Sequence, residues 1–592
     1  MHHSRTRQLR IVAQDPTIKG KDGKILTASV TVPSEVFSPG PNGYRVHVID
    51  YDSSTGTHYM PRDYPPRQNG QLPDPFDKIK NDEVILENPQ FHAQNAYAIV
   101  MRTLARFEFA LGRRISWGFD GHQINVAPHA FADANAFYSK YDRALMFGYF
   151  QSPVSGKNTF TCLSHDIVVH ETTHALVDGL RERFIAPSSP EQAGFHEGFA
   201  DVVALLSVFS LREVIAYLID AAPNHPDLQA LNIPTPSNPD LIDADYLKKD
   251  ALRKSVLFGL ADQMGQELSG VRGQALRRSV LIDPVAPGGD PYLGQEAFEE
   301  PHRCGELFVA AMMNAFLEVW LIRIDRLKRS NTEKQHLDRL LVVEQGADAA
   351  DHLLTMAIRA LDYTPPTDIR FADYLSAFLT ADMEAVPDDT RYNYRKHILD
   401  SFRAYGIEPS SPHPLGIWEP EVEFAEHLKY DSTHFESLMR EPNEVFRFIW
   451  DNRGILRVDE RAYTHVQSVR PCLRVAPDGF ILRETVAEYV QIIELFASEL
   501  EQLSPPIGKP DAMPGSTPVR LLGGGTLIFD EYGRLKYHIA NRIFSAGLVG
   551  ERIEYLWKYG YYSARDEDEN QFARMHLRRS AVFSNHFVEE EF

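Results

Sequence analysis

The sequence predicts an α+β protein in which strand-rich and helix-rich regions follow one another along the chain. Residues 1–85 alternate short apolar runs with Pro and Gly turn signals, and residues 115–150 are strand-like and rich in aromatic side chains. Across residues 158–405, apolar side chains recur every three or four positions, which is the period of helices packed on a core. Residues 421–592 carry both signals. Such segregation of strands from helices is typical of the α+β class.

Length and composition indicate a globular chain of several domain-sized units. The 592 residues carry 61 Lys and Arg against 82 Asp and Glu, so the formal net charge is −21. Hydrophobic residues make up 43% and charged residues 24%, which excludes wholesale disorder and fibrous repeats. Because phosphate binding needs a basic surface, the acidic excess argues against nucleic acid as a partner, and likewise against an anionic membrane.

The cysteines and the apolar segments predict a cytoplasmic protein. Cys162, Cys304 and Cys472 are odd in number and far apart, so no disulfide framework is expected. No apolar signal segment follows the basic N-terminal residues, and the apolar stretch 308–322 is too short to cross a bilayer. A non-standard route of secretion stays open.

Helical periodicity and turn signals divide the chain into four regions. These are a β-rich N-terminal extension at 1–85, an N-terminal catalytic lobe at 86–175, a helical C-terminal lobe at 176–405, and a separate α+β domain of unknown role at 421–592. The Pro-rich segment 406–420 is the expected linker. Expected helices cover 91–113, 164–180, 197–219, 243–268, 305–328, 347–362, 371–385 and 484–503. Hairpins are expected at 470–483 and 526–539, with a glycine turn at 523–525 before the second.

The most informative motif is His170-Glu171-Thr172-Thr173-His174, within an apolar helical pattern. Positions i and i+4 lie about 40° apart around a helix, so both imidazoles leave the same face. One rigid element can then place two ring nitrogens about 2.0–2.1 Å from a single zinc ion. Glu171 points to another side of the metal, where it can act as general base toward a metal-bound water.

A catalytic zinc ion needs a third protein ligand, and Glu197 is the candidate. It lies 23 residues after His174, which leaves room for a helix end, a loop and a returning helix. Asp201 follows one helical turn later on the same face. From there its carboxylate can accept the second ring N–H of a ligand histidine and fix its tautomer.

These residues resemble the zinc site of the thermolysin-like metallopeptidases, the gluzincins. The segments HETTHALVDGL and HEGFAD match the family's two metal-binding helices. Asn135-Ala136-Phe137-Tyr138, followed by residues 146–149, is similar to the family's substrate strand. The resemblance implies that Asn135 and Ala136 hold an extended peptide. It covers roughly residues 90–390 and implies a two-lobed core.

Two further residues take roles only from this resemblance. In the family, an arginine that contacts the substrate carbonyl stands before an Asp-Pro pair. Arg278 stands in the same way before Asp283-Pro284, and Arg277 is the alternative. His302, just before the helix expected from 305, resembles the histidine that stabilises the oxyanion. Glu299 or Glu300 would hold that histidine charged.

The sequence also departs from the family pattern, and these departures limit what the resemblance predicts. The loop between His174 and Glu197 is longer than usual, and the tyrosine expected there as a second oxyanion donor has no counterpart. Val208 stands where an acidic calcium ligand would be expected. The sequence therefore predicts one zinc ion and does not imply calcium.

Together these observations predict a zinc-dependent endopeptidase that hydrolyses peptide bonds with a metal-activated water and Glu171 as general base. Its partner would be a peptide or protein substrate, with no nucleic acid and no membrane. The alternative is an inactive or weakly active protein of the same fold that acts as a binding or scaffold module. An aminopeptidase ranks last, because the Gly-x-Met-Glu-Asn strand that captures a free amine is absent. The sequence leaves the oligomeric state and the cleavage specificity open.

Overall fold

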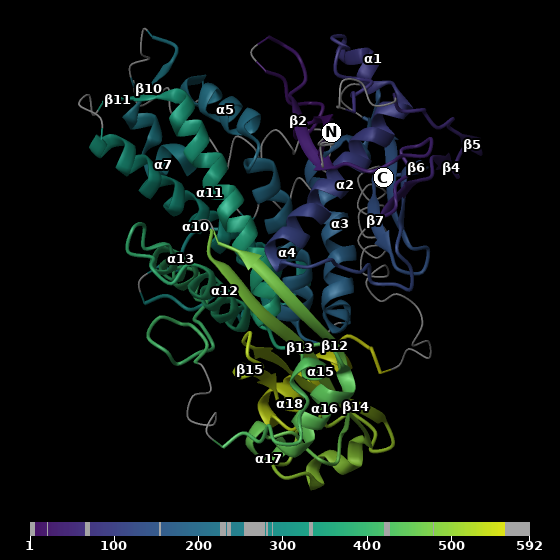
Figure 1. The fold of residues 1–592 in the computed structure, drawn as a ribbon, viewed down its shortest axis with the longest axis vertical. Helices are drawn as coiled ribbons and strands as arrows, with labels where there is room; N and C mark the ends of the chain where they lie inside the picture. Colours follow the sequence, from purple (N-terminus) through teal and green to yellow (C-terminus); the bar gives the residue numbers. More distant parts are fainter. Residues whose placement is uncertain are drawn as a thin grey trace, which may run out of the picture.

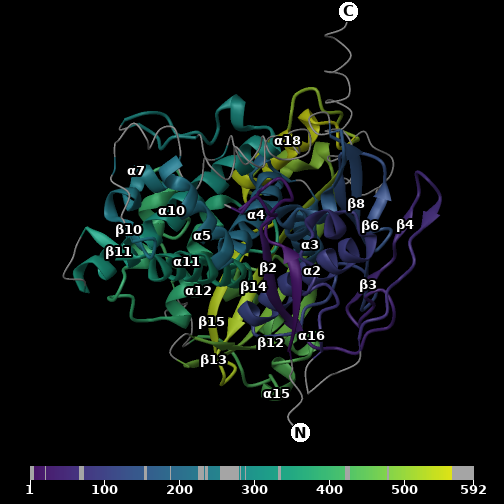
Figure 2. The ribbon, with the colours of Figure 1, turned by 90° about the horizontal axis from the view of Figure 1, so that it is seen from above.

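The computed structural model describes residues 6–20, 22–65, 72–152, 156–186, 188–224, 233, 238–253, 279, 282–286, 288–330, 335–419, 427–476 and 479–562. Over these residues the chain is a mixed α and β protein with several separate sheets, compatible with the α+β class. Figure 1 shows the sheet that holds β6 and β7 on one side, helices α5, α7, α10 and α11 on the other, and α3 and α4 between them. Figure 2 shows the same separation from above.

The secondary structure alternates along the chain much as its composition predicts. The strands are β1 Thr6–Val12, β2 Thr27–Pro33, β3 Val46–Val48, β4 Tyr51–Asp52, β5 Thr57–His58, β6 Ile124–Phe131, β7 Ala136–Ser139, β8 Ala144–Gln151, β9 Asn158–Phe160, β10 Leu241–Asp243, β11 His336–Asp338, β12 Tyr463–Val475, β13 Ile481–Phe496, β14 Pro518–Phe529 and β15 Leu535–Asn541. The main helices are α1 Asp82–Leu86, α2 Pro89–Leu111, α3 His165–Leu180, α4 Pro190–Phe209, α5 Arg212–Ala221, α7 Lys249–Leu252, α10 Pro301–Ser330, α11 Arg339–Ala360, α12 Phe371–Ala385, α13 Tyr394–Arg403, α15 Phe435–Leu438, α16 Pro442–Asp451, α17 Arg453–Leu456 and α18 Ala546–Lys558.

The N-terminal sheet has the order β3-β6-β8-β7, with β9 also paired to β8. Strands β3, β6 and β8 run parallel, whereas β7 is antiparallel to β8. Because β3 belongs to this sheet, residues 1–85 are continuous with the structure that follows them. The β1–β2 hairpin also buries Leu9, Ile11 and Val30 in the hydrophobic core that contains α2.

Helices α2 and α3 follow the predicted ranges closely. The side chain of Asn88 accepts hydrogen bonds from the backbone N–H groups of Gln90 and Phe91, and Pro89 occupies the first turn. Gly112, with φ of 66°, ends the helix in the left-handed conformation that glycine adopts without strain. Helix α3 packs along α2 and is buried over almost its whole length.

The single helix predicted at 197–219 is wrong: it is two helices, α4 and α5, bent by 80°. Helix α4 begins earlier, because the Ser189 side chain caps the N–H of Gln192. It ends at Phe209, and the hydroxyl of the next residue, Ser210, donates to the carbonyl of Ser207. Such a local hydrogen bond competes with continued helix, and the extended backbone of Leu211 starts the new direction.

Helices α4 and α10 cross in direct backbone contact at three glycines, Gly194, Gly198 and Gly305. A Cβ atom built on Gly198 would lie 2.8 Å from the Gly305 carbonyl oxygen, and one on Gly305 would lie 2.7 Å from the Gly194 carbonyl oxygen. Side chains larger than hydrogen would therefore push the two helices apart. This crossing brings the start of α10 beside the middle of α4.

Helix α10 begins at Pro301, four residues earlier than predicted, and extends to Ser330. Its segment Pro301–Lys328 is long and apolar enough to cross a membrane by length and composition, and 72% of its most apolar window is buried inside the protein. A helix buried in the core of a protein can have the same length and apolar composition. Trp320, fully buried, donates its indole N–H to the carbonyl of Val342 and ties α10 to α11.

Three further helices were predicted within residues 176–405, and their outcomes differ. Helix α12 has the predicted bounds, and α11 begins earlier than predicted because Asp338 caps it through the N–H of Leu341. Of the helix predicted at 243–268, the described part holds only the short α7, and residues 254–268 lie outside the described residues.

The C-terminal region is a four-stranded antiparallel sheet with the order β12-β13-β14-β15. Both predicted hairpins are confirmed. The helix predicted at 484–503 is wrong, because β13 occupies this segment as a central strand and residues 484–491 are all buried. Both faces of this buried run mix apolar and polar residues, among them Glu484, Glu488 and Gln491, so it lacks the alternation that identifies strands. The glycines at 523–525 lie within β14 and form no turn.

The two faces of this sheet pack against different parts of the molecule. Leu527 and Phe529 belong to a cluster with Phe448 of α16, whereas Ile528 belongs to the main hydrophobic core. Since successive side chains of a strand point to opposite faces, one face covers α16 and the other covers the core. The C-terminal region is thus joined to the rest of the chain.

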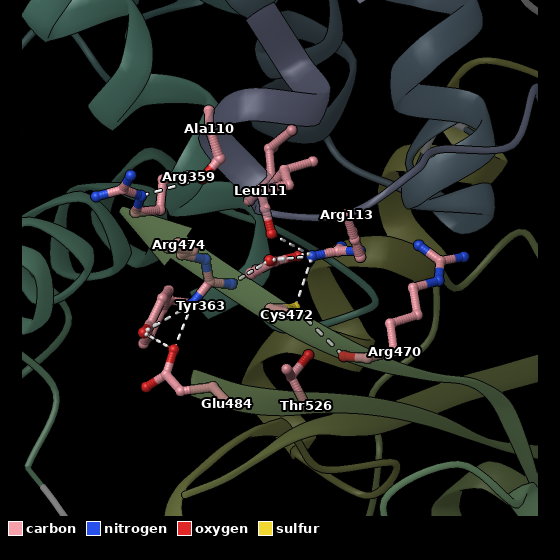
Figure 3. A network of polar contacts seen from close by, with 12 residues as sticks. Ala110, Leu111, Arg113, Arg359, Tyr363, Arg470, Cys472, Arg474, Glu484 and Thr526 are labelled. Atoms are coloured by element: carbon pink, nitrogen blue, oxygen red, sulfur yellow. Dashed lines mark hydrogen bonds and ion pairs between the residues drawn. The ribbon is translucent and has the colours of Figure 1, made fainter. Parts of the chain in front are cut away.

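Buried charges complete this junction (Figure 3). Arg474 of β12 forms ion pairs with Asp362 and with Glu484 of β13, and all three side chains are buried. Arg113, just after α2, holds both carboxylate oxygens of Asp362 at 2.5 and 2.6 Å. Burial alone would raise the pKa of Asp362, but the Arg113 and Arg474 guanidinium groups hold it well below its usual range. The network ties α2 and the end of α11 to the C-terminal sheet.

Replacing Gly198 by alanine should separate α4 from α10. Because the added methyl would meet backbone atoms that cannot rotate away, we expect Gly198→Ala to lower the free energy of unfolding by about 1–3 kcal/mol. Urea denaturation measures this change. Gly547→Ala in α18 is the matched control, since no atom lies within 4 Å of its added Cβ. Equal stability of Gly198→Ala and wild type would contradict the backbone contact.

Removing the Arg474 guanidinium should destabilise the junction with the C-terminal sheet. In Arg474→Met, Glu484 and Asp362 stay buried with fewer partners, and we expect a loss of about 3–5 kcal/mol. Arg520→Met is the control, because the Arg520–Glu494 pair is exposed and such pairs contribute about 0–1 kcal/mol. Thermal or urea unfolding of the full chain compares them, and similar losses in both variants would refute the role of the buried network.

Candidate metal centre

Helix α3 presents His170, Glu171 and His174 from neighbouring positions. The three side chains are buried, and the Nε2 atoms of His170 and His174 lie 2.7 Å apart. One helical turn separates the two histidines, so their rings leave the same face as the sequence predicts.

Helix α4 supplies the third member of the cluster, Glu197. Its carboxylate oxygens lie 3.6 Å from the Nε2 of His170 and 3.7 Å from the Nε2 of His174. One ligand atom from each of the three buried residues lies within 4.8 Å of the others. The predicted ligand residues are therefore brought together, in a group that could hold a metal ion.

Asp201 fixes the tautomer of His170. Its Oδ1 lies 2.6 Å from the Nδ1 of His170 and, as a carboxylate oxygen, accepts the ring N–H there. In the neutral ring the Nε2 then carries a lone pair that faces His174 and Glu197. An acceptor on the second nitrogen is the usual support of a metal-binding histidine. The predicted contact between Asp201 and a ligand histidine is confirmed.

The two imidazoles and one carboxylate form a donor set that zinc accepts. Catalytic zinc sites use three protein ligands of these types and keep one position open.

Glu171 is fully buried and lies between the cluster and strand β7. Its Oε2 accepts a hydrogen bond of 3.0 Å from the backbone N–H of Tyr138. The general-base candidate is thereby held by the sheet as well as by its own helix.

Strand β7, with Ala136 at its start, lies at the end of the sheet order, and no other described strand pairs with its outer edge. Because the N–H of Tyr138 points to Glu171 and away from β8, the backbone groups of Ala136, two residues earlier, point to the same outer edge. The Asn135 side chain accepts from the N–H of Ala136, which orders this end of the strand. Asn135 and Ala136 therefore lie on the strand that contacts Glu171.

His302 reaches the cluster from the first turn of α10. The expectation that it precedes this helix is wrong, because α10 begins at Pro301. Its Nε2 lies 3.9 Å from Oε2 of Glu197, and its Nδ1 lies 2.6 Å from Oε1 of Glu300. Glu299 pairs instead with Lys558 of α18. Burial raises the pKa of Glu300, but hydrogen bonds from His302 and nearby backbone N–H groups outweigh burial and lower it to about 2.

One neighbour of the centre was missed by sequence reasoning. The ring of His196 stacks on that of His174, with ring centres 4.7 Å apart and planes within 10°. Its position next to Glu197 was the available signal. The stacking restricts the rotation of His174 from the side of α4.

The predicted substrate arginine cannot be placed, because Arg278 and its alternative Arg277 lie outside the described residues. Asp283, which follows them in the sequence, forms an ion pair with Arg253 at 3.2 Å.

No known protein family model matches the chain, and no curated protein matches it either. The chemistry of the centre must therefore be argued from its own residues.

Replacing Asp201 should weaken metal binding without removing a ligand. In Asp201→Asn the side chain still fits but no longer carries the charge that favours the Nδ1–H form of His170, so we expect metal affinity at this centre to fall 10- to 100-fold. Competition with a chromophoric zinc chelator measures the affinity. Asp338→Asn, at the distant cap of α11, is the control. Unchanged affinity in Asp201→Asn would contradict the assignment.

Proposed function

We propose that the chain is a thermolysin-like zinc metallopeptidase, with a two-lobed catalytic core, that cleaves peptide bonds within peptide or protein substrates. The observation that carries this proposal is the convergence of His170, His174 and Glu197 with the carboxylate of Glu171 beside them. Two buried helices supply all four groups, so the arrangement is rigid before substrate binds.

His170, His174 and Glu197 would hold the zinc ion, which, when bound, acidifies water and polarises a carbonyl group. Asp201 keeps the Nε2 lone pair of His170 directed at the ion, and His196 restricts the ring of His174.

Glu171 moves the proton. As a carboxylate it takes a proton from the attacking water and then passes it to the leaving amine nitrogen. Its hydrogen bond from the Tyr138 N–H orients one of its carboxylate oxygens.

His302 supports the charge that develops on the scissile carbonyl oxygen. Glu300 accepts its Nδ1–H, so the ring is oriented with Nε2 toward the cluster. When doubly protonated it donates from Nε2 to the oxyanion, which is the role expected of a fixed hydrogen-bond donor in such a site.

Strand β7 is the proposed binding edge for the substrate. An extended peptide can donate to the outward carbonyl oxygen of Ala136, whose N–H is taken by the Asn135 side chain at the start of that edge. Main-chain pairing binds peptides of varied sequence, which suits cleavage within a chain better than capture of a free terminus.

Glu171→Gln should abolish hydrolysis and leave metal binding intact. The amide cannot take the proton, and we expect the rate to fall at least 10²- to 10⁴-fold. Cleavage of a mixed peptide library, followed by mass spectrometry with and without chelator, measures activity and specificity together. Glu436→Gln, on the exposed face of α15, is the matched control.

The same experiment separates a catalyst from a scaffold. Chelator-sensitive cleavage by wild type that Glu171→Gln lacks supports the peptidase. A wild-type chain that binds metal and peptides but cleaves none would refute it and favour a binding module of the same fold. Elemental analysis of His170→Ala should show one metal equivalent fewer per chain.

A further inference from the structure

A second group of metal-ligating side chains lies away from the centre on α3 and α4. His92 of α2, His129 of β6 and Cys162, in the turn before α3, offer one ligand atom each within 4.8 Å of one another. All three are buried, and none takes part in the proposed hydrolysis. The three residues come from distant segments, so no local pattern in the sequence joins them.

The hydrogen bonds around the two imidazoles fix the direction of their lone pairs. The Nε2 of His92 lies 2.7 Å from the carbonyl oxygen of Leu86, and the Nδ1 of His129 lies 2.7 Å from Oδ1 of Asp50. Both partners only accept hydrogen bonds, so each ring places a proton on its outer nitrogen. The inner nitrogens, Nδ1 of His92 and Nε2 of His129, then face each other at 2.8 Å.

Two lone pairs at this separation need a cation between them or beside them. A backbone carbonyl on one histidine and a carboxylate on the other are the partners that typically orient metal-binding imidazoles. Cys162 adds a sulfur donor to the same small volume. The turn that carries it is itself fixed, because Asn95 of α2 donates to the Cys162 carbonyl at 2.8 Å.

We infer that His92, His129 and Cys162 bind a second zinc ion, which braces the start of helix α3. Two nitrogens and a thiolate suit zinc. The charges of a zinc ion, the Cys162 thiolate and the Asp50 carboxylate sum to zero. Because the site is buried, this neutrality favours a divalent ion. On binding, the Cys162 thiol releases its proton to solvent as the zinc–sulfur bond forms, so charge and atoms balance.

The surface offers a path to this site. Asp50 and Tyr59 line a cavity of about 250 Å³, and the Tyr59 ring lies 4.8 Å from that of His129. Because Asp50 lines this cavity and also contacts His129, the cavity is the candidate entry route for the ion and for the water at the fourth position of tetrahedral zinc.

The position of the ion indicates a structural role. It would join α2, the central strand β6 and the turn that ends two residues before His165 starts α3. Since α3 carries His170, Glu171 and His174, the second ion would hold the active helix against the sheet. Its residues are separate from those of the first centre, so the two sites can be tested independently.

Cobalt substitution distinguishes the two sites by their ligands. The full chain is stripped with chelator and reloaded with Co²⁺, and its near-ultraviolet spectrum is recorded. Only a site with a cysteine ligand gives a thiolate-to-cobalt charge-transfer band, so we expect the band in wild type and in His174→Ala. It should disappear in Cys162→Ser and persist in the matched control Cys304→Ser, whose thiol is equally buried.

Zinc counting by elemental analysis completes the test. Wild type should hold one more equivalent than Cys162→Ser or His129→Gln. No charge-transfer band in wild type would overturn the inference without any variant, and would mean that the imidazoles only share a proton. A band that survives Cys162→Ser would overturn the ligand assignment, and uptake of copper(I) but not zinc would overturn the choice of ion. Loss of zinc only on His170→Ala would remove the second site while leaving the proposed peptidase centre in place.

Discussion

The close crossing of α4 and α10 is the constraint on which the candidate centre depends. Gly194, Gly198 and Gly305 let two helix backbones touch, and no other residue type fits between them. The crossing sets how far Glu197 on one helix stands from His302 on the other. It thereby connects a centre built on α3 and α4 to a helix that begins more than a hundred residues later.

The parts of the centre that sequence could predict are those controlled by local geometry. His170 and His174 share a face because the helix repeats every 3.6 residues, and Asp201 follows Glu197 by one turn for the same reason. The position of His302 was anticipated only through a family resemblance, since its distance to Glu197 depends on the helix crossing. The stacking of His196 on His174 required the two helices to be placed first.

The same difference between local and long-range geometry explains which secondary-structure predictions were right and which were wrong. Helix α2 has clear caps, at Asn88 and Gly112, so its bounds were predictable. Strand β13 was predicted as a helix because both faces of its buried run mix apolar and polar residues, and only its neighbours β12 and β14 show that it is a strand. The ion pair between Arg474 and Asp362 joins residues 112 positions apart and leaves no local pattern.

The junction with the C-terminal sheet has a consequence for the order in which the protein is made. Arg181, immediately after α3, donates to Glu488, which follows it by 307 positions. A growing chain on the ribosome therefore holds every residue of the metal centre long before this buried guanidinium meets its carboxylate. Until β12 to β15 emerge, the end of α3 stays hydrated and the helix that carries His170 lacks its final support. The support that this sheet gives to the end of α3 thus forms only after β12 to β15 have been made.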